Sequence, residues 1–171
     1  PVAVRRFGKR YEKLFGKGWD PDNTIRNLPL FIKDEFSRPR DSRKNWRDHV
    51  MGWHDGGRGR EGVVYLSYEE LLKDAPGTMT RVITEITGAP PDPWLVAQTT
   101  DKYDMSRQTG GRKAGDEDRS SFIRKGVAGD WVNHFTKDTS KLFHELAGDA
   151  LLALGYEKDP EWWKRLDVGE D

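Results

Sequence analysis

The chain has 171 residues, with 29 basic and 29 acidic side chains, no cysteine and a formal net charge of zero. This length fits one domain. The neutral charge removes the overall attraction expected of a dedicated nucleic-acid binder, so any bound anion must be held by a local cluster. Without cysteine there can be no disulfide, thiolate zinc site or cysteine nucleophile.

Hydropathy gives no sign of a membrane protein. No apolar run approaches the roughly 20 residues that cross a bilayer, and the amino terminus lacks the pattern of a signal peptide. We therefore expect a soluble, cytoplasmic protein with no membrane partner. Charged residues make up 34% of the chain, which is typical of disorder, but 11% are aromatic, which favours a folded domain with a core rich in large rings.

The first third of the chain predicts two helices separated by a long loop. Residues 1–4 are apolar and are typical of the end of a buried strand. Residues 5–15 carry large apolar side chains at helical spacing and predict a helix ended by glycines. Residues 16–45 contain three prolines and predict a loop with one helical turn near 30–36. The spacing of the apolar side chains in 46–53 predicts an amphipathic helix.

A glycine-rich stretch at 57–62 has the spacing of a dinucleotide fingerprint, but that motif must follow a strand. Here it precedes a predicted strand at Val63–Leu66, so we interpret it as a flexible link. Ser67 and Glu70 form a capping box that starts a helix directly after the strand. This places Tyr68 at the carboxyl end of a strand, where open α/β sheets bind their ligands. The alternative is a half-buried aromatic side chain in a first helical turn.

The second half of the chain alternates helices with polar segments. Residues 79–86 predict an amphipathic helix, and 94–97 predict a short one. Residues 104–121 contain one apolar side chain larger than alanine and predict a mobile surface loop. Residues 142–154 predict a strong final helix that ends before a glycine.

The segment before the final helix carries the chemistry. Arg124 and Lys125 supply a planar fork and a point charge, and Gly126 lets its backbone amide approach a phosphate oxygen closely. These residues predict a cradle for an anion. The alternative for an isolated motif of this kind is a solvated basic turn.

The residues around this cradle extend the pattern. Residues 124–136 read Arg-Lys-Gly-x-x-Gly-Asp-Trp-x-Asn-x-Phe-Thr, and the final helix ends in Leu-Gly-Tyr at 154–156. This closely resembles the carboxyl-terminal signature of the sulfotransferases that use 3′-phosphoadenosine 5′-phosphosulfate. Weaker blocks at 46–53, 64–74 and 2–5 resemble further motifs of that family, in the same order. The resemblance implies a P-loop-like α/β fold with a parallel sheet, of which this chain is mostly the helical carboxyl-terminal part.

The resemblance also implies residue roles. Arg124, Lys125 and the Gly126 amide would hold the 3′-phosphate of the cofactor, and Tyr68 would contact the nucleoside. Arg5 stands where the family has a serine that binds the 3′-phosphate, and an arginine there could still reach it.

The family also places a Thr-Ser-Phe-x-x-Met segment against adenine. Thr100–Met105 occupies that place but matches poorly. Tyr103 could stack on adenine if one extra residue is allowed, whereas strict spacing puts Lys102 there, and the two alternatives stay open.

Part of the family's machinery is absent from the sequence. Members carry a Pro-Lys-x-Gly-Thr loop that binds the 5′-phosphosulfate, followed by a catalytic histidine, and these 171 residues contain no such loop. His49 and His134 do not match the catalytic histidine and are expected to be structural, so no catalytic residue is assigned. We expect residues 1–171 to be part of one longer domain; the alternative is a degenerate relative.

The function hypothesis follows from these points. The intact protein would move a sulfuryl group from 3′-phosphoadenosine 5′-phosphosulfate to a small-molecule hydroxyl, leaving adenosine 3′,5′-bisphosphate, without a metal. The family's dimer motif is altered at Val132 and Lys137, so the oligomeric state is not predicted. One rival is a non-catalytic nucleotide-binding relative. Another is a basic-loop module for phosphate or nucleic acid, which the interspersed acidic residues disfavour.

Overall fold

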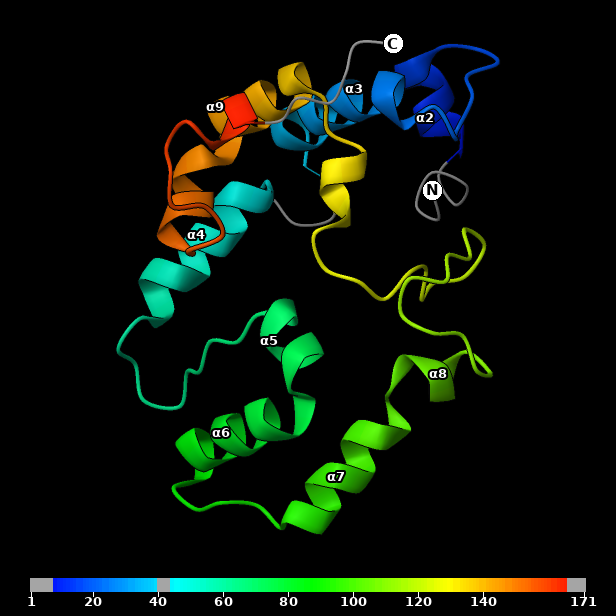
Figure 1. Ribbon diagram of the computed structural model, residues 1–171. Helices are drawn as coiled ribbons and strands as arrows, with labels where there is room; N and C mark the ends of the chain where they lie inside the picture. The colour runs from blue at the N-terminus through cyan, green and yellow to red at the C-terminus, as the bar shows by residue number, and fades with distance from the viewer. Residues whose placement is uncertain (1–7, 40–43, 166–171) are drawn as a thin grey trace. The chain divides into compact units, whose positions relative to one another are not determined.

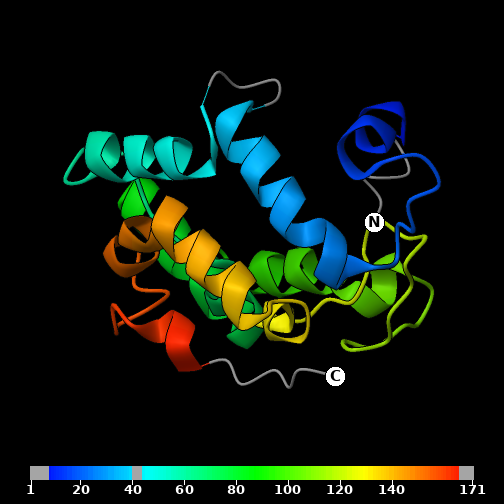
Figure 2. The same ribbon diagram turned by 90° about the horizontal axis from the view of Figure 1, so that it is seen from above.

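The computed structural model describes residues 8–39 and 44–165, which form helices joined by loops (Figures 1 and 2). They fall into two compact units, one made of residues up to Arg58 and from Asp130 onward, the other of Gly59–Gly129. The helices of the first unit are α2 (Gly8–Phe15), α3 (Thr24–Ser37), α4 (Trp46–Gly57), η1 (Asp130–Asn133), α9 (Lys137–Ala153) and η2 (Trp162–Arg165). Those of the second are α5 (Tyr68–Lys73), α6 (Ala75–Thr87), α7 (Pro93–Lys102) and α8 (Met105–Gln108). No helix within the described ranges is long and apolar enough to cross a membrane.

Side-chain caps determine where the helices of the first unit begin. The Asn45 side chain accepts a hydrogen bond from the backbone N–H of Asp48 at 2.9 Å. Thr136 caps α9 in the same way through the N–H of Thr139, at 3.2 Å. Such caps satisfy donors that have no partner inside the helix. The helices predicted from residues 46–53, 142–154 and the amino-terminal apolar pattern are confirmed, with α4 and α9 longer than the apolar spacing indicated.

Helix α3 corrects the prediction of a long loop. The prediction of a single turn within residues 16–45 is wrong, because 14 of these residues form one helix with Pro29 inside it. A proline in a helix interior costs about 3 kcal/mol, which is why the sequence favours a break. Asn23 caps the helix by accepting from the N–H of Arg26 at 3.1 Å, and Ile32 is buried where α3 packs on α2 and α9. This packing offsets the cost of the proline.

A cluster of partly exposed aromatic rings joins α3, α4 and α9 in the first unit. Phe143 on α9 meets Phe36 of α3 and Trp46 of α4, with ring centroids 5.8 and 5.7 Å away. Phe135, just before α9, lies 5.9 Å from Phe143 and packs edge-on against Trp131. Edge-to-face pairs of this kind are favourable beyond the area they bury. This cluster lies where α9 packs beside α3 and α4 (Figure 2).

An ion pair also links α4 to α9. The Nε of Arg47 lies 2.9 Å from Oδ1 of Asp149, and a second guanidinium nitrogen contacts the other carboxylate oxygen. This two-point hydrogen bond lowers the pKa of Asp149 and raises the pKa of Arg47. Bidentate pairs fix relative orientation more firmly than single contacts, so this one holds α4 against α9.

The second unit is a series of short helices, each packed on the next: α5 on α6, α6 on α7, and α7 on α8. The predicted capping box is present, because Ser67 Oγ accepts from the Glu70 N–H at 3.1 Å and Glu70 Oε2 accepts from the Ser67 N–H at 2.7 Å. Asp74, Asp92 and Asp104 cap α6, α7 and α8. The predicted polar loop 104–121 is therefore wrong in its first part, since the Asp104 cap starts a helical turn there.

The predicted strand is not observed. Within residues 8–39 and 44–165, Val63–Leu66 does not pair with another segment as a strand, and these ranges contain no strand. A strand exists only where a neighbour supplies a ladder of hydrogen bonds. Here the Val63 N–H donates to the carbonyl of Arg60, and Arg81 donates to the carbonyl of Tyr65. The parallel sheet is therefore not confirmed, and the expected strand at residues 1–4 lies outside the described residues.

Candidate functional site

The Arg124–Gly126 turn lies in the second unit, at the end of the irregular segment that follows α8. Gly126 has a φ of +65°, in the left-handed region that glycine adopts without strain. A Cβ at this position would lie 2.1 Å from Sδ of Met105. The turn thus packs so closely against the first residue of α8 that a side chain at Gly126 would require Met105 or the turn to shift.

Backbone hydrogen bonds close the segment into a loop. The Gly115 N–H donates to the carbonyl of Lys125 at 2.8 Å, and the Asp118 N–H donates to the carbonyl of Arg124 at 2.9 Å. Asp118 also accepts from the N–H and hydroxyl of Ser120, as acidic residues do in tight turns. The backbone carbonyls of two cradle residues therefore join the end of the loop to its earlier part.

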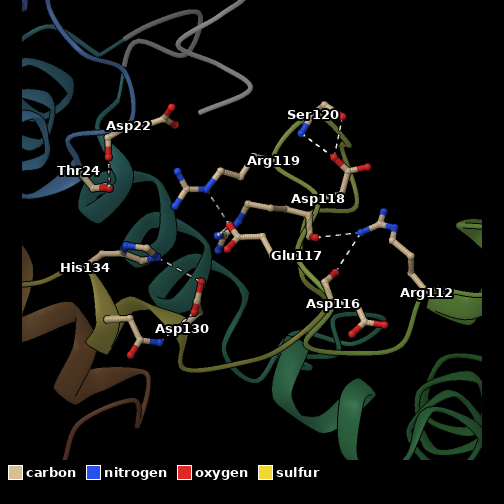
Figure 3. Close-up of polar contacts among 12 residues, drawn as sticks. Asp22, Thr24, Arg112, Asp116, Glu117, Asp118, Arg119, Ser120, Asp130 and His134 are labelled. Atoms are coloured by element: carbon tan, nitrogen blue, oxygen red, sulfur yellow. Dashed lines mark hydrogen bonds and ion pairs between the residues drawn. The ribbon is translucent and has the colours of Figure 1, made fainter.

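Arg112 adds a side-chain contact from inside the loop. Its guanidinium donates to the carbonyls of Asp116, Ile123 and Arg124 and to the hydroxyl of Ser121, at 2.6–3.2 Å. Figure 3 shows this guanidinium directed at the loop backbone near Asp116. An arginine fork suits several acceptors at once because its donors are fixed in one plane.

Charge at the cradle is balanced by an acidic neighbour. Arg124 donates a hydrogen bond to Oε1 of Glu117. Nε of Arg119 lies 3.6 Å from the same oxygen (Figure 3). The hydrogen bond from Arg124 is the main reason that the pKa of Glu117 is lowered. Both side chains of the pair are partly exposed, so an incoming anion can compete with this carboxylate for the Arg124 guanidinium.

The other predicted site residues are only partly brought together. Tyr103 is the C-cap residue of α7, two residues before Met105, and Lys102 Nζ lies 5.5 Å from the centre of its ring. Tyr103 is 66% exposed and Tyr68 is 51% exposed, so both rings are open to a ligand. Tyr68 begins α5, and no hydrogen bond or ring contact joins it to the cradle within the described residues. Arg5 lies outside the described residues.

The histidine near the cradle motif has a local partner. His134 Nε2 lies 3.3 Å from Oδ2 of Asp130, four residues earlier in the first unit (Figure 3). This contact agrees with a structural role for His134. His49 has an exposed side chain. The described residues contain no cluster of three or more His, Asp or Glu side chains that could hold a metal ion.

Sequence reasoning missed three residues of the site: Met105, Arg112 and Glu117. Met105 fits the methionine position of the Thr100–Met105 comparison, and its contact with Gly126 was not deduced. Arg112 and Glu117 lie in a segment dense in charges, where nothing in the spacing separates a buried contact from a solvated one. Only the folded loop shows which charges face its interior.

The curated proteins that this chain resembles include several sulfotransferases. Sulfotransferase 2B1 of Rattus norvegicus is 28% identical over 153 residues, covering 84% of this chain and 43% of the relative. Sulfotransferase 1C2 of Homo sapiens is 32% identical over 111 residues, covering 60% of this chain and 37% of the relative. The 3-alpha-hydroxysteroid sulfotransferase of Cavia porcellus is 34% identical over 110 residues, covering 60% and 38%.

The chain spans less than half the length of each of these relatives. No solved structure matches it. The family model of the sulfotransferase domain matches residues 20–155, which include the Arg124–Gly126 turn and Tyr68. The resemblance inferred from the motifs is therefore confirmed, and the chain belongs to the sulfotransferase domain family.

Proposed function

We propose that this chain forms the 3′-phosphate-binding part of a sulfotransferase that uses 3′-phosphoadenosine 5′-phosphosulfate. The observation that carries the proposal is the Arg124–Gly126 turn, in which two cationic residues directly precede a glycine packed against Met105. Family membership supports the same function. The chemistry of the donors fits a phosphate, because guanidinium, ammonium and backbone amide are the groups that bind it in proteins.

The cradle would hold the cofactor by exchanging one anion for another. Arg124 is paired with Glu117 in the structure, and the 3′-phosphate would replace this carboxylate on the guanidinium. Lys125 would add a second positive charge, and the Gly126 amide would donate to a phosphate oxygen that no side chain keeps at a distance. Bound 3′-phosphoadenosine 5′-phosphosulfate would supply the sulfuryl group that is transferred.

The nucleoside contacts are proposed from the aromatic side chains of the same unit. Tyr68 and Tyr103 are both more than half exposed and could each stack on the adenine or contact the ribose. Lys102, whose ammonium lies over the Tyr103 ring, is the alternative to Tyr103. Arg5 would add a further cation to the 3′-phosphate.

The acceptor is proposed to be a hydroxyl group of a small molecule. Sulfuryl transfer needs a base for the acceptor proton and positive charge at the leaving phosphate. The contacts described above concern the 3′-phosphate, which takes no part in the bond exchange. We therefore propose a binding role for Arg124, Lys125 and Gly126 and assign no catalytic residue.

Calorimetry with adenosine 3′,5′-bisphosphate tests this proposal. Arg124→Ala removes the central cation and should weaken binding by about tenfold or more, since hydrogen bonds to charged groups contribute about 1.5–3 kcal/mol. Arg107→Ala is the matched control, because Arg107 is an exposed arginine of the same unit that pairs with Asp101. Equal affinities of the two variants would contradict the proposal.

A further inference from the structure

The loop that carries the cradle has almost no apolar material to hold its shape. Between Thr109 and Lys125, the apolar side chains larger than alanine are Phe122 and Ile123, and Phe122 is 93% exposed. Hydrophobic burial therefore contributes little to this conformation, and hydrogen bonds must supply what holds it.

The Arg112 side chain provides four of these hydrogen bonds. Nη1 donates to the carbonyl oxygens of Asp116 at 3.2 Å and Arg124 at 3.1 Å. Nη2 donates to the hydroxyl of Ser121 at 3.0 Å and to the carbonyl of Ile123 at 2.6 Å. Asp116 lies in the first part of the loop and the other three acceptors lie in its last part. A single guanidinium therefore links the two parts.

The direction of the held carbonyls determines where the cradle amides point. Arg112 holds the carbonyls of Ile123 and Arg124, and the Gly115 N–H holds that of Lys125. In a planar trans peptide the N–H points opposite to the C=O. The N–H groups of Arg124, Lys125 and Gly126 are therefore turned away from the loop interior. Successive amides that face one way are a recurrent means of binding anions.

We infer that Arg112 is a positioning residue, whose guanidinium fixes the backbone of residues 123–125 so that the Arg124–Gly126 cradle presents its donors to a phosphate. This inference rests on the proposed function for its ligand. The part of the inference that concerns structure, namely that Arg112 stabilises the loop conformation, depends only on the hydrogen bonds of Arg112. Arg112 itself would not touch the phosphate.

A lysine at position 112 would keep the charge and lose the fork. An ammonium is a point donor and cannot hold acceptors at four positions in a plane. Arg112→Lys and Arg112→Gln should therefore have similar effects, which a purely electrostatic role of Arg112 does not predict. Arg107→Lys and Arg107→Gln make the same changes on α8, where the side chain is exposed and pairs with Asp101.

The test combines calorimetry with amide hydrogen exchange in the purified protein, after circular dichroism shows that each variant keeps its helices. Both Arg112 variants should weaken binding of adenosine 3′,5′-bisphosphate by roughly tenfold and leave binding of 5′-AMP unchanged. They should also speed exchange at the Gly115 and Asp118 amides, which donate to the cradle carbonyls. The Arg107 variants should change none of these quantities.

Wild-type affinity or unchanged amide exchange in Arg112→Lys would overturn the inference. Equal weakening for the bisphosphate and 5′-AMP would also overturn it, because the effect would not be specific to the 3′-phosphate. If the wild-type protein does not prefer the bisphosphate but exchange still accelerates in both variants, the proposed function fails and the bracing role of Arg112 is supported.

Discussion

Replacement of Gly126 by alanine should destabilise the protein through two separable effects. The backbone φ of +65° costs an L-residue about 1–2 kcal/mol relative to glycine. The new Cβ would also lie 2.1 Å from Sδ of Met105, so either the thioether or the turn must move. Overpacking of this kind typically costs about 1–3 kcal/mol, which gives a total of about 2–5 kcal/mol.

Gly129 offers a matched control three residues away. Its φ of +75° is similar, but nothing lies within 4 Å of the position a Cβ would take. Gly129→Ala should therefore lose only the conformational part, about 1–2 kcal/mol. The free energy of unfolding of both variants can be measured by urea denaturation followed by far-UV circular dichroism.

The close contact with Met105 predicts a further interaction between the two sites. Met105→Ala in the Gly126→Ala background should recover part of the loss, giving a positive coupling in a double-mutant cycle. The reasoning is refuted if Gly126→Ala and Gly129→Ala lose the same free energy. Absence of coupling between positions 105 and 126 would refute it as well.

Three further changes test the charges and rings described above. Glu117→Gln should tighten binding of adenosine 3′,5′-bisphosphate a few-fold, because the carboxylate that competes for Arg124 loses its charge; calorimetry measures this. Asp149→Asn should lower the free energy of unfolding at neutral pH and flatten its decline in acid. Arg47 lowers the pKa of Asp149 in the folded protein, so the contribution of the pair is present above the ordinary aspartate pKa and is lost as pH falls through the lowered one. Tyr68→Ala should weaken bisphosphate binding by about tenfold, the loss expected when a base loses its stacking partner.

Each of these changes has a control variant with the same chemical substitution. Asp101→Asn removes an exposed carboxylate from the same unit as Glu117 and should leave the affinity unchanged. Asp138→Asn does the same on α9 for Asp149 and should leave the acid decline intact. Tyr156 is 51% exposed, as Tyr68 is, and its replacement by alanine should not affect binding. If a control variant changes the affinity or the stability as much as its test variant does, the corresponding prediction is contradicted.

Local signals predicted most of the helices correctly. The Ser67–Glu70 capping box and the apolar spacing of α9 act within a few residues, so the sequence contains all the information that forms them. Pro29 is the counterexample. Its local cost predicts a break, and only the packing of α3 on α2 and α9 shows why the helix continues through it.

The sequence does not show which segments or side chains contact one another. Val63–Leu66 has the composition of a strand, but a strand also needs a neighbour, and none is present within the ranges that the structure describes. The cradle shows the same limit. Arg124, Lys125 and Gly126 were found from their chemistry, whereas the contacts of Arg112 and Glu117 depend on how the loop closes.

Recognition of the 3′-phosphate by the Arg124–Gly126 cradle can be measured directly. Calorimetric titration of the wild-type protein with adenosine 3′,5′-bisphosphate and, separately, with 5′-AMP isolates that group, because the two ligands differ only there. We predict that the bisphosphate binds at least about tenfold more tightly, as expected when a charged group gains hydrogen-bond partners. Equal affinities for the two ligands would contradict the central claim.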